Sequence, residues 1–143
     1  YVTGADSLLS PDMNNDSISI YSHSDYLSFI GSGNECIGSP VYFFFELGTA
    51  QLTDKSQLVN LDELARVTKK YGLSVTVAGA ADAATGTADI NNKLSASRAD
   101  YIVMELRRRG VTVENITKVC QGGISNYVPT EANRHTKVIL YMK

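Results

Sequence analysis

An acidic residue at the end of one predicted strand and a basic residue on the next predicted helix are the side chains best placed for chemistry. Asp82 follows residues 73–79, whose apolar alternation predicts a strand, and Arg98 lies in a helix expected to begin between Thr87 and Asn91. The two groups would face a shared crevice. A carboxylate and a guanidinium together suit a ligand that carries an ammonium and a carboxylate close together.

Asn91 is predicted to lie near the same crevice. It precedes Arg98 by seven residues, so at about 100° per residue the two lie within about 20° of one another on the helix. Both flank the apolar face formed by Ala99, Ile102, Val103 and Leu106. A plainer interpretation is that Asp82 and Arg98 form a salt bridge worth at most ~1 kcal/mol when exposed. Asn91 and Ser95 would then serve as local hydrogen-bonding or capping groups.

The elements that position these residues follow from hydrophobic spacing and from glycine stops. In chain order we expect a buried strand at 41–45, a helix from Thr53 or Asp54 to Gly72, a strand at 73–79, a helix ending at Arg109 before Gly110, and strands at 117–121 and 135–142. The pattern predicts an α+β fold, a two-layer sandwich whose mixed four-stranded sheet carries two main helices on one face, in the order βαβαββ. A right-handed crossover would make the first two strands parallel.

The first forty residues differ in composition from the rest. They are rich in Ser, Asn, Asp and Gly, with short apolar stretches at 18–20 and 26–30 and a breaker at 31–34. We interpret residues 1–40 as an N-terminal extension or linker with short edge strands, ahead of a domain at 41–143. Because the chain begins with tyrosine and shows no signal-peptide pattern, we expect it to be processed or part of a longer protein.

Composition narrows the function classes. The 143 residues carry a net charge of −2 with a pI of about 5.6 and no basic stripe, which argues against a nucleic-acid partner. No apolar run reaches the ~18 residues that a membrane span needs. Two His and two Cys without ligand spacing disfavour a metal site. Cys36 and Cys120 could form a disulfide or remain two buried thiols, and composition alone does not decide between them.

From residue 41 to the end the sequence resembles the OmpA-like domain, the module that holds bacterial envelope proteins to peptidoglycan. The markers occur in order: a Phe-rich first strand, Gly79 and Asp82 in one loop, Gly86, the run Asn91-x-x-Leu94-Ser95-x-x-Arg98-Ala99, Leu106, Gly110-Val111 and Asn133-Arg134. Three features depart from the family pattern. Ala80 and Ala81 replace an aromatic or His and a Thr, three residues rather than two separate Asp82 from Gly86, and the usual Asn-Arg-Arg ends in His135.

The resemblance implies a non-catalytic site without a cofactor, in which the ligand is the diaminopimelate of the peptidoglycan stem peptide. Asp82 would take the ammonium, and Arg98 would take the carboxylate. Loop amides around Asp82, at Ala81 and Ala83, would assist, while Asn91 would orient the loop or touch the ligand. Arg134 occupies a position where the family often has a ligand-side arginine. If Asp82 and Arg98 face the ligand, alanine at either should remove binding and leave the melting temperature nearly unchanged.

The resemblance also implies a place in the cell and a role. We expect a periplasmic domain, associated with the outer membrane through the rest of a full-length protein that is membrane-anchored upstream of this fragment. Export would favour a disulfide between Cys36 and Cys120. The sequence leaves open whether the domain forms a homodimer.

Two other readings of the sequence compete with wall binding. One is a degenerate OmpA-like module used only for structure or assembly, which the altered Ala80-Ala81 loop favours. The other is an enzyme in which Cys120 acts with His135 or His23. No third catalytic member accompanies that pair.

Overall fold

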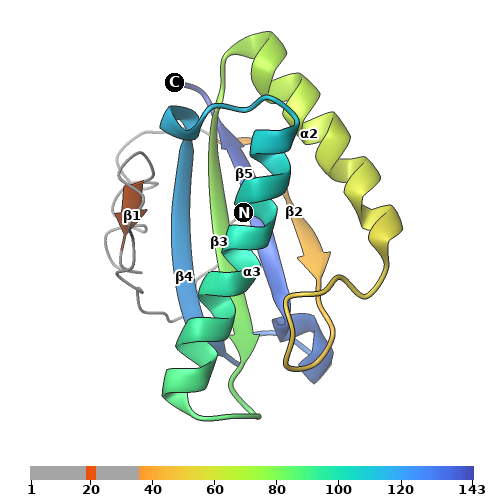
Figure 1. Cartoon of the computed structure of the whole chain (residues 1–143), viewed down its shortest axis with the longest axis vertical. Coiled ribbons are helices and arrows are strands. Elements are labelled where there is room, and N and C mark those ends of the chain that lie inside the picture. Colours follow the sequence, from red (N-terminus) through yellow and green to blue (C-terminus); the bar gives the residue numbers. More distant parts are fainter. Residues whose placement is uncertain (1–18, 22–35) are drawn as a thin grey trace.

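Five strands form one mixed sheet in the computed structural model, which describes residues 19–21 and 36–143 (Figure 1). They are β1 (Ser19–Tyr21), β2 (Cys36–Phe44), β3 (Ser74–Asp82), β4 (Ile116–Ile124) and β5 (His135–Tyr141). Their order across the sheet is β1-β4-β3-β5-β2. β4 pairs in parallel with β1 and β3, and β5 runs antiparallel to both β3 and β2.

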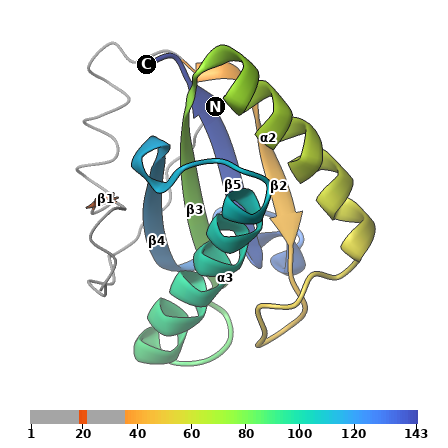
Figure 2. The same ribbon diagram turned by 45° about the horizontal axis from the view of Figure 1, so that its top comes forward.

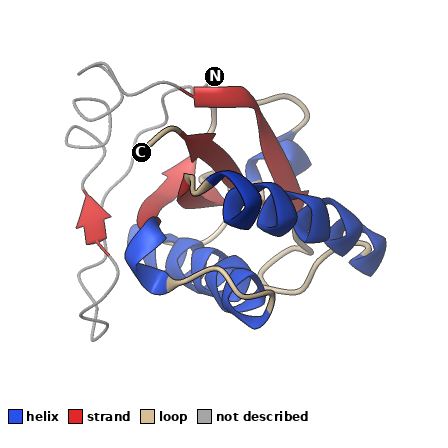
Figure 3. Cartoon of the chain, turned by 90° about the horizontal axis from the view of Figure 1, so that it is seen from above, coloured by secondary structure: helices blue, strands red, loops and turns tan. Residues whose placement is uncertain are grey.

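Two long helices cover one face of this sheet (Figure 3). They are α2 (Leu58–Tyr71) and α3 (Ala88–Arg108), and short 3-10 turns occur at η1 (Lys55–Gln57), η2 (Val113–Asn115) and η3 (Thr130–Asn133). α3 lies over β3 and β4, whereas α2 lies toward β2 (Figure 2). The predicted α+β sandwich with four main strands and two main helices is confirmed, and β1 adds a short strand beside β4.

The helix-covered face holds the main apolar core. Its side chains without solvent exposure include Phe43, Leu61, Val75, Val77, Ala99, Ile102, Leu106 and Val138. The apolar face predicted for α3 is therefore the face that packs on the sheet. Gly72 ends α2 in the left-handed conformation, with φ of 63°, and Gly110 follows α3 with φ of 92°. Both glycine stops are confirmed.

The first predicted strand occupies a different place from the one expected. The continuous apolar run at 41–45 suggested a strand covered on both faces, but β2 lies at an edge of the sheet and begins at Cys36. Phe44 remains 36% exposed. β2 and β3 are parallel, as predicted, yet β5 lies between them. The apolar pattern was misleading because only one face of β2 meets the core.

The disulfide that the resemblance implied is wrong for this structure, in which Cys36 and Cys120 are not joined. Cys36 starts β2 and Cys120 lies on β4, with β3 and β5 between the two strands. Three strand spacings amount to about 14 Å, beyond the ~7 Å limit between bridged Cα atoms. Sequence separation gave no information on strand order.

A glycine brings the Asp82 end of β3 close to α3. A Cβ at Gly79 would overlap the Ser95 carbonyl oxygen and lie 2.8 Å from the Ala99 amide nitrogen, so a larger residue would push the helix away. The close approach lets Ser95 Oγ accept a hydrogen bond from Gly122 N at 3.0 Å. α3 begins beyond this contact, where Thr87 caps it by accepting from Ile90 N at 3.2 Å.

Several predictions lie outside the described residues. They are the apolar stretch at 26–30, the breaker at 31–34, His23 and most of the 1–40 extension. Among the described residues, no helix has the length and apolar character required to cross a membrane.

Candidate ligand site

Arg98 lies on α3 beside the end of β3 and is completely buried. Its guanidinium donates three hydrogen bonds to backbone carbonyls, from Nε to Thr49 O at 2.8 Å, from Nη1 to Ala80 O at 3.0 Å and from Nη2 to Glu46 O at 3.1 Å. The group also lies 5.5 Å from the centroid of the Phe45 ring. Arg98 thus fastens the segment after β2 to the end of β3.

The electrostatic surroundings of Arg98 agree with this buried position. Burial and, to a smaller extent, repulsion from Arg134 lower the pKa of its guanidinium to about 10, and the Asp82 carboxylate opposes both effects. The group still carries its charge at neutral pH. Two of its five N–H donors are not used in the three carbonyl contacts.

Asp82 forms its ion pair with Arg134 rather than with Arg98. Asp82 Oδ2 lies 3.4 Å from Arg134 Nη2, and Asp82 Oδ1 accepts from Ala84 N at 2.9 Å. The Asp82 residue is only 3% exposed, whereas 17% of the Arg134 side chain is exposed. The Nε of Arg134 is buried without a hydrogen-bond partner among the described residues. Arg134 therefore has donor capacity left for a ligand.

The loop after Asp82 is held by its own hydrogen bonds. Ala83 N donates to Ile124 O at 2.9 Å, Thr85 N donates to Asp82 O at 3.3 Å, and Asn91 Nδ2 donates to Thr85 O at 2.9 Å. Asn91 is buried and orients the loop, one of the two roles foreseen for it. Ala81 is buried and Ala83 is exposed at the loop surface. The Ala83 amide, one of the two expected to serve a ligand, thus already has a partner.

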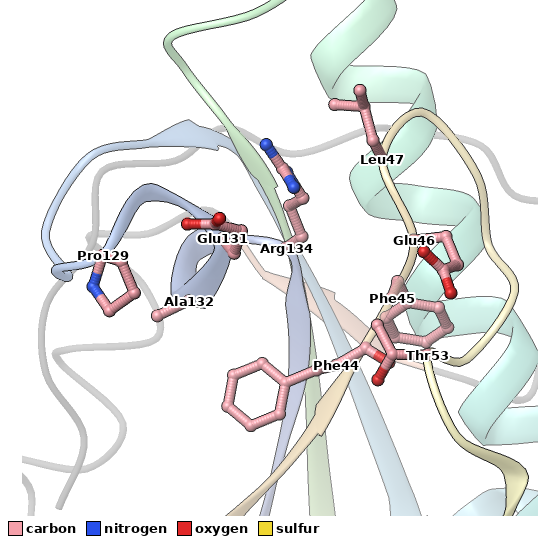
Figure 4. A pocket seen from close by; sticks show the side chains of 9 residues that line it. All are labelled: Phe44, Phe45, Glu46, Leu47, Thr53, Pro129, Glu131, Ala132 and Arg134. Carbon is pink, nitrogen blue, oxygen red and sulfur yellow. The ribbon is translucent and has the colours of Figure 1, made fainter.

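A cavity of about 310 Å³ opens beside Arg134 (Figure 4). It is lined by Phe44, Phe45, Glu46, Leu47, Thr53, Pro129, Glu131, Ala132 and Arg134. One guanidinium and two carboxylates therefore share the cavity with an apolar wall. Mixed linings of this kind can hold a ligand with both charged and hydrocarbon parts.

The turn that carries Arg134 is held by its neighbour His135, which has no solvent exposure. His135 Nδ1 donates to Ala132 O at 2.6 Å. The ring packs edge-to-face against Tyr42 and Tyr127, with centroid distances of 5.0 and 5.2 Å. Burial lowers the pKa of His135 to about 4, with smaller contributions in the same direction from Lys137 and Arg98 and an opposing one from the Ala132 hydrogen bond.

The structure brings the predicted residues together at one end of the sheet but distributes their roles differently. The expectation of unchanged melting temperature assumed that Asp82 and Arg98 face away from the core, and the burial of both contradicts it. Sequence reasoning did not find Phe44, Glu46 or Glu131 as cavity residues. Phe44 was assigned to a buried strand, and no spacing signal connected the other two to Arg134.

The catalytic reading gains no geometric support. Cys120 pairs with Gly79 and lies on the helix-covered face, and Gly79 also pairs with Thr136. Because strand side chains alternate, His135 lies on the opposite face of the sheet. Within residues 19–21 and 36–143 no cluster of three or more His, Cys, Asp or Glu side chains could hold a metal ion.

A comparison with known protein families shows to which class of protein the domain belongs. The OmpA family model matches residues 44–137, and the chain belongs to the OmpA family.

One sequence relative and two solved structures illustrate what the chain is similar to. Over 74 residues, or 52% of this chain, the sequence is 35% identical to Outer membrane protein 40 of Porphyromonas gingivalis, and the match spans only 19% of that protein. The cell wall anchor of the T6SS from Pseudomonas aeruginosa aligns with a TM-score of 0.58 and 17% identity, covering 82% of this chain and 94% of that chain. The peptidoglycan-associated lipoprotein from Burkholderia pseudomallei gives a TM-score of 0.55 and 17% identity, covering 71% and 89%. At these identities the two structures show a shared fold.

Proposed function

We propose that this domain binds peptidoglycan non-covalently through the diaminopimelate of the stem peptide. In this role it anchors an envelope protein to the cell wall from the periplasm, with the rest of the protein attached to the outer membrane. The function is binding without catalysis. The observation that carries the proposal is the Asp82–Arg134 ion pair, whose arginine lines an open cavity.

A zwitterionic ligand would bind by exchanging ionic partners with Asp82 and Arg134. The Asp82–Arg134 contact is long, at 3.4 Å, and has a single N–O approach, so it is weaker than the close two-point pair that an arginine can form with a carboxylate. The ammonium of diaminopimelate would take the place of Arg134 beside Asp82. Arg134 would turn to the carboxylate of the ligand and could bind it with two parallel N–H groups. Each charge exchanges one partner for another, and no buried charge is left unpaired.

The remaining predicted residues hold this pair in place. Arg98 keeps the Glu46–Thr49 segment and Ala80 together and, because it is completely buried, supports the ligand through the segments that it holds. Asn91 fixes the loop through Thr85. Ala81 and Ala83 flank Asp82 and set the path of its backbone. The positive end of α3 adds a favourable field for the ligand carboxylate.

Family membership supports the same function. The aligned P. aeruginosa structure is described as a cell wall anchor, and the B. pseudomallei structure as peptidoglycan-associated. The matched relative from P. gingivalis is an outer membrane protein, in agreement with an envelope location.

One observation favours a second candidate, a structural or assembly module that does not bind the wall. Both carboxylate oxygens of Asp82 already have partners, and Arg98 is completely buried. A module that does not bind the wall, and in which Asp82 is paired only within the domain, would have the same contacts. The two candidates differ in whether Asp82 and Arg134 separate for a ligand.

Cosedimentation with purified peptidoglycan tests the proposal. We expect wild-type protein to sediment with diaminopimelate-containing sacculi, to be released by free diaminopimelate and to bind lysine-type sacculi weakly, because lysine lacks the second carboxylate. Asp82→Asn should remove binding. Arg66→Ala is a matched control, since Arg66 belongs to an exposed ion pair with Glu63 on α2. Wild-type protein that stays in the supernatant with both wall types would establish the assembly module instead.

A further inference from the structure

Phe44 combines exposure with rigidity at the edge of the candidate site. Phe44 N donates to Gln57 Oε1 at 2.7 Å, and Phe44 O accepts from Thr53 N at 2.9 Å and from Gln57 Nε2 at 3.3 Å. Both backbone groups on the outer edge of β2 are therefore held. The residue is still 36% exposed. Exposed apolar side chains are common on protein surfaces, but this one lines the cavity beside Arg134.

The ring of Phe44 is also fixed by aromatic neighbours. It lies nearly parallel to the Tyr42 ring at a centroid distance of 6.2 Å with an interplanar angle of 12°, and it meets the His135 ring at 6.2 Å and 81°. From this position it extends toward Ala132 and forms one wall of the cavity (Figure 4). A ligand that packs on this ring would not have to order it first.

The charges around the ring indicate what kind of ligand part would pack there. Arg134 lines the same cavity, and the carboxylates of Glu46 and Glu131 also line it. Ala132 and Pro129 continue the apolar wall from Phe44. A surface of this kind suits an unbranched hydrocarbon chain attached to a zwitterionic amino-acid end.

We infer that Phe44 is a specificity-determining residue that packs against the methylene chain of the zwitterionic ligand while Arg134 holds its carboxylate. The inference rests on the proposed function and names the part of the ligand that the cavity recognises besides its charges. Because Phe44 touches hydrocarbon only, it contributes to selectivity through chain length rather than through charge.

A series of competitors measures this contribution directly. Alanine, 2-aminobutyrate, norvaline and norleucine carry the same zwitterionic end and differ by one methylene group at each step. Each would be titrated against protein bound to diaminopimelate-containing sacculi. With wild-type protein we expect the competing concentration to fall at each step, by at most roughly fourfold per methylene. With Phe44→Ala the four competitors should become nearly equivalent, and Phe44→Leu should restore part of the dependence.

Controls separate this inference from the proposed function. Tyr71→Ala removes an exposed aromatic side chain on α2 and should keep the wild-type dependence on chain length. If wild-type protein fails to sediment with sacculi, the proposed function fails and the inference fails with it. If wild-type protein sediments but shows no dependence on chain length, or if folded Phe44→Ala keeps the full dependence, only the role of Phe44 is overturned. Melting curves establish that each variant is folded.

Discussion

Arg98 and Arg134 present the same guanidinium group at the same end of the domain, but their surroundings differ. Arg98 is fully buried and bonds three backbone carbonyls from two separate segments. Arg134 lines a cavity, keeps part of its side chain exposed, and has one long contact to Asp82. Arg98 therefore holds two segments of the domain together, whereas Arg134 has N–H groups available for a ligand.

The difference teaches that a motif locates a site better than it assigns roles within it. The run from Asn91 to Ala99 puts Arg98 on the face of α3 that meets the end of β3. What that arginine bonds depends on the Glu46–Thr49 segment, which lies about fifty residues earlier in the chain. We therefore assign stability mainly to Arg98 and ligand contact mainly to Arg134. The predictions below test this division.

The largest expected effect is the loss of stability in Arg98→Ala. The substitution removes the donors for three carbonyls, of which the Ala80 group is buried, and leaves an empty volume under the Glu46–Thr49 segment. We expect the free energy of unfolding to fall by about 3 kcal/mol or more. Arg98→Lys should recover little, because an ammonium cannot reach three divergent acceptors. Chemical denaturation measures the change, and a loss below ~1 kcal/mol would contradict the structural role.

The next effect concerns the turn that holds Arg134 and appears on acidification. The pKa of His135 is lowered from its ordinary 6.5 to about 4 by burial, so the unfolded chain takes up a proton at a higher pH than the folded domain. Stability should therefore decline as the pH falls from about 6.5 toward 4, by up to about 3 kcal/mol from this group. The charged groups that face it, Lys137 and Arg98, act in the same direction.

His135→Gln provides the comparison for the acid effect. It removes the titrating ring, and its amide nitrogen can still donate toward Ala132 O. The variant should lose stability at pH 7 but should vary less between pH 6.5 and 4 than the wild type. Equal pH dependence in both proteins, measured by urea denaturation at several pH values, would exclude His135 as the source.

Sequence alone predicted those parts of the fold that depend on local pattern. The apolar spacing of α3, the stops at Gly72 and Gly110 and the largely apolar run of β5 each arise from a physical requirement within one segment. The edge position of β2 and the separation of Cys36 from Cys120 depend on strand order, for which neither segment carries a signal. Neither segment predicts the cavity, because the end of β2, the loop that follows it and the η3 turn come together there only after folding.

The smallest expected effect on stability, and the most informative about the division of roles, belongs to Arg134→Ala. Arg134 has a partly exposed side chain, and without it the buried Asp82 carboxylate would keep the Ala84 amide and the nearby charge of Arg98, so its removal should cost about 1–2 kcal/mol of unfolding free energy, less than the loss of Arg98. Binding should change far more, because the ligand carboxylate would lose a charge-assisted, two-point contact, worth over tenfold in affinity. Arg134→Lys should bind nearly as weakly, since a single ammonium cannot make that contact. Sedimentation with sacculi and a melting curve on the same samples give both quantities. If Arg134→Ala binds like the wild type while a folded Arg98 variant does not, ligand contact belongs to Arg98, and the buried arginine must release the Glu46–Thr49 carbonyls to reach the wall.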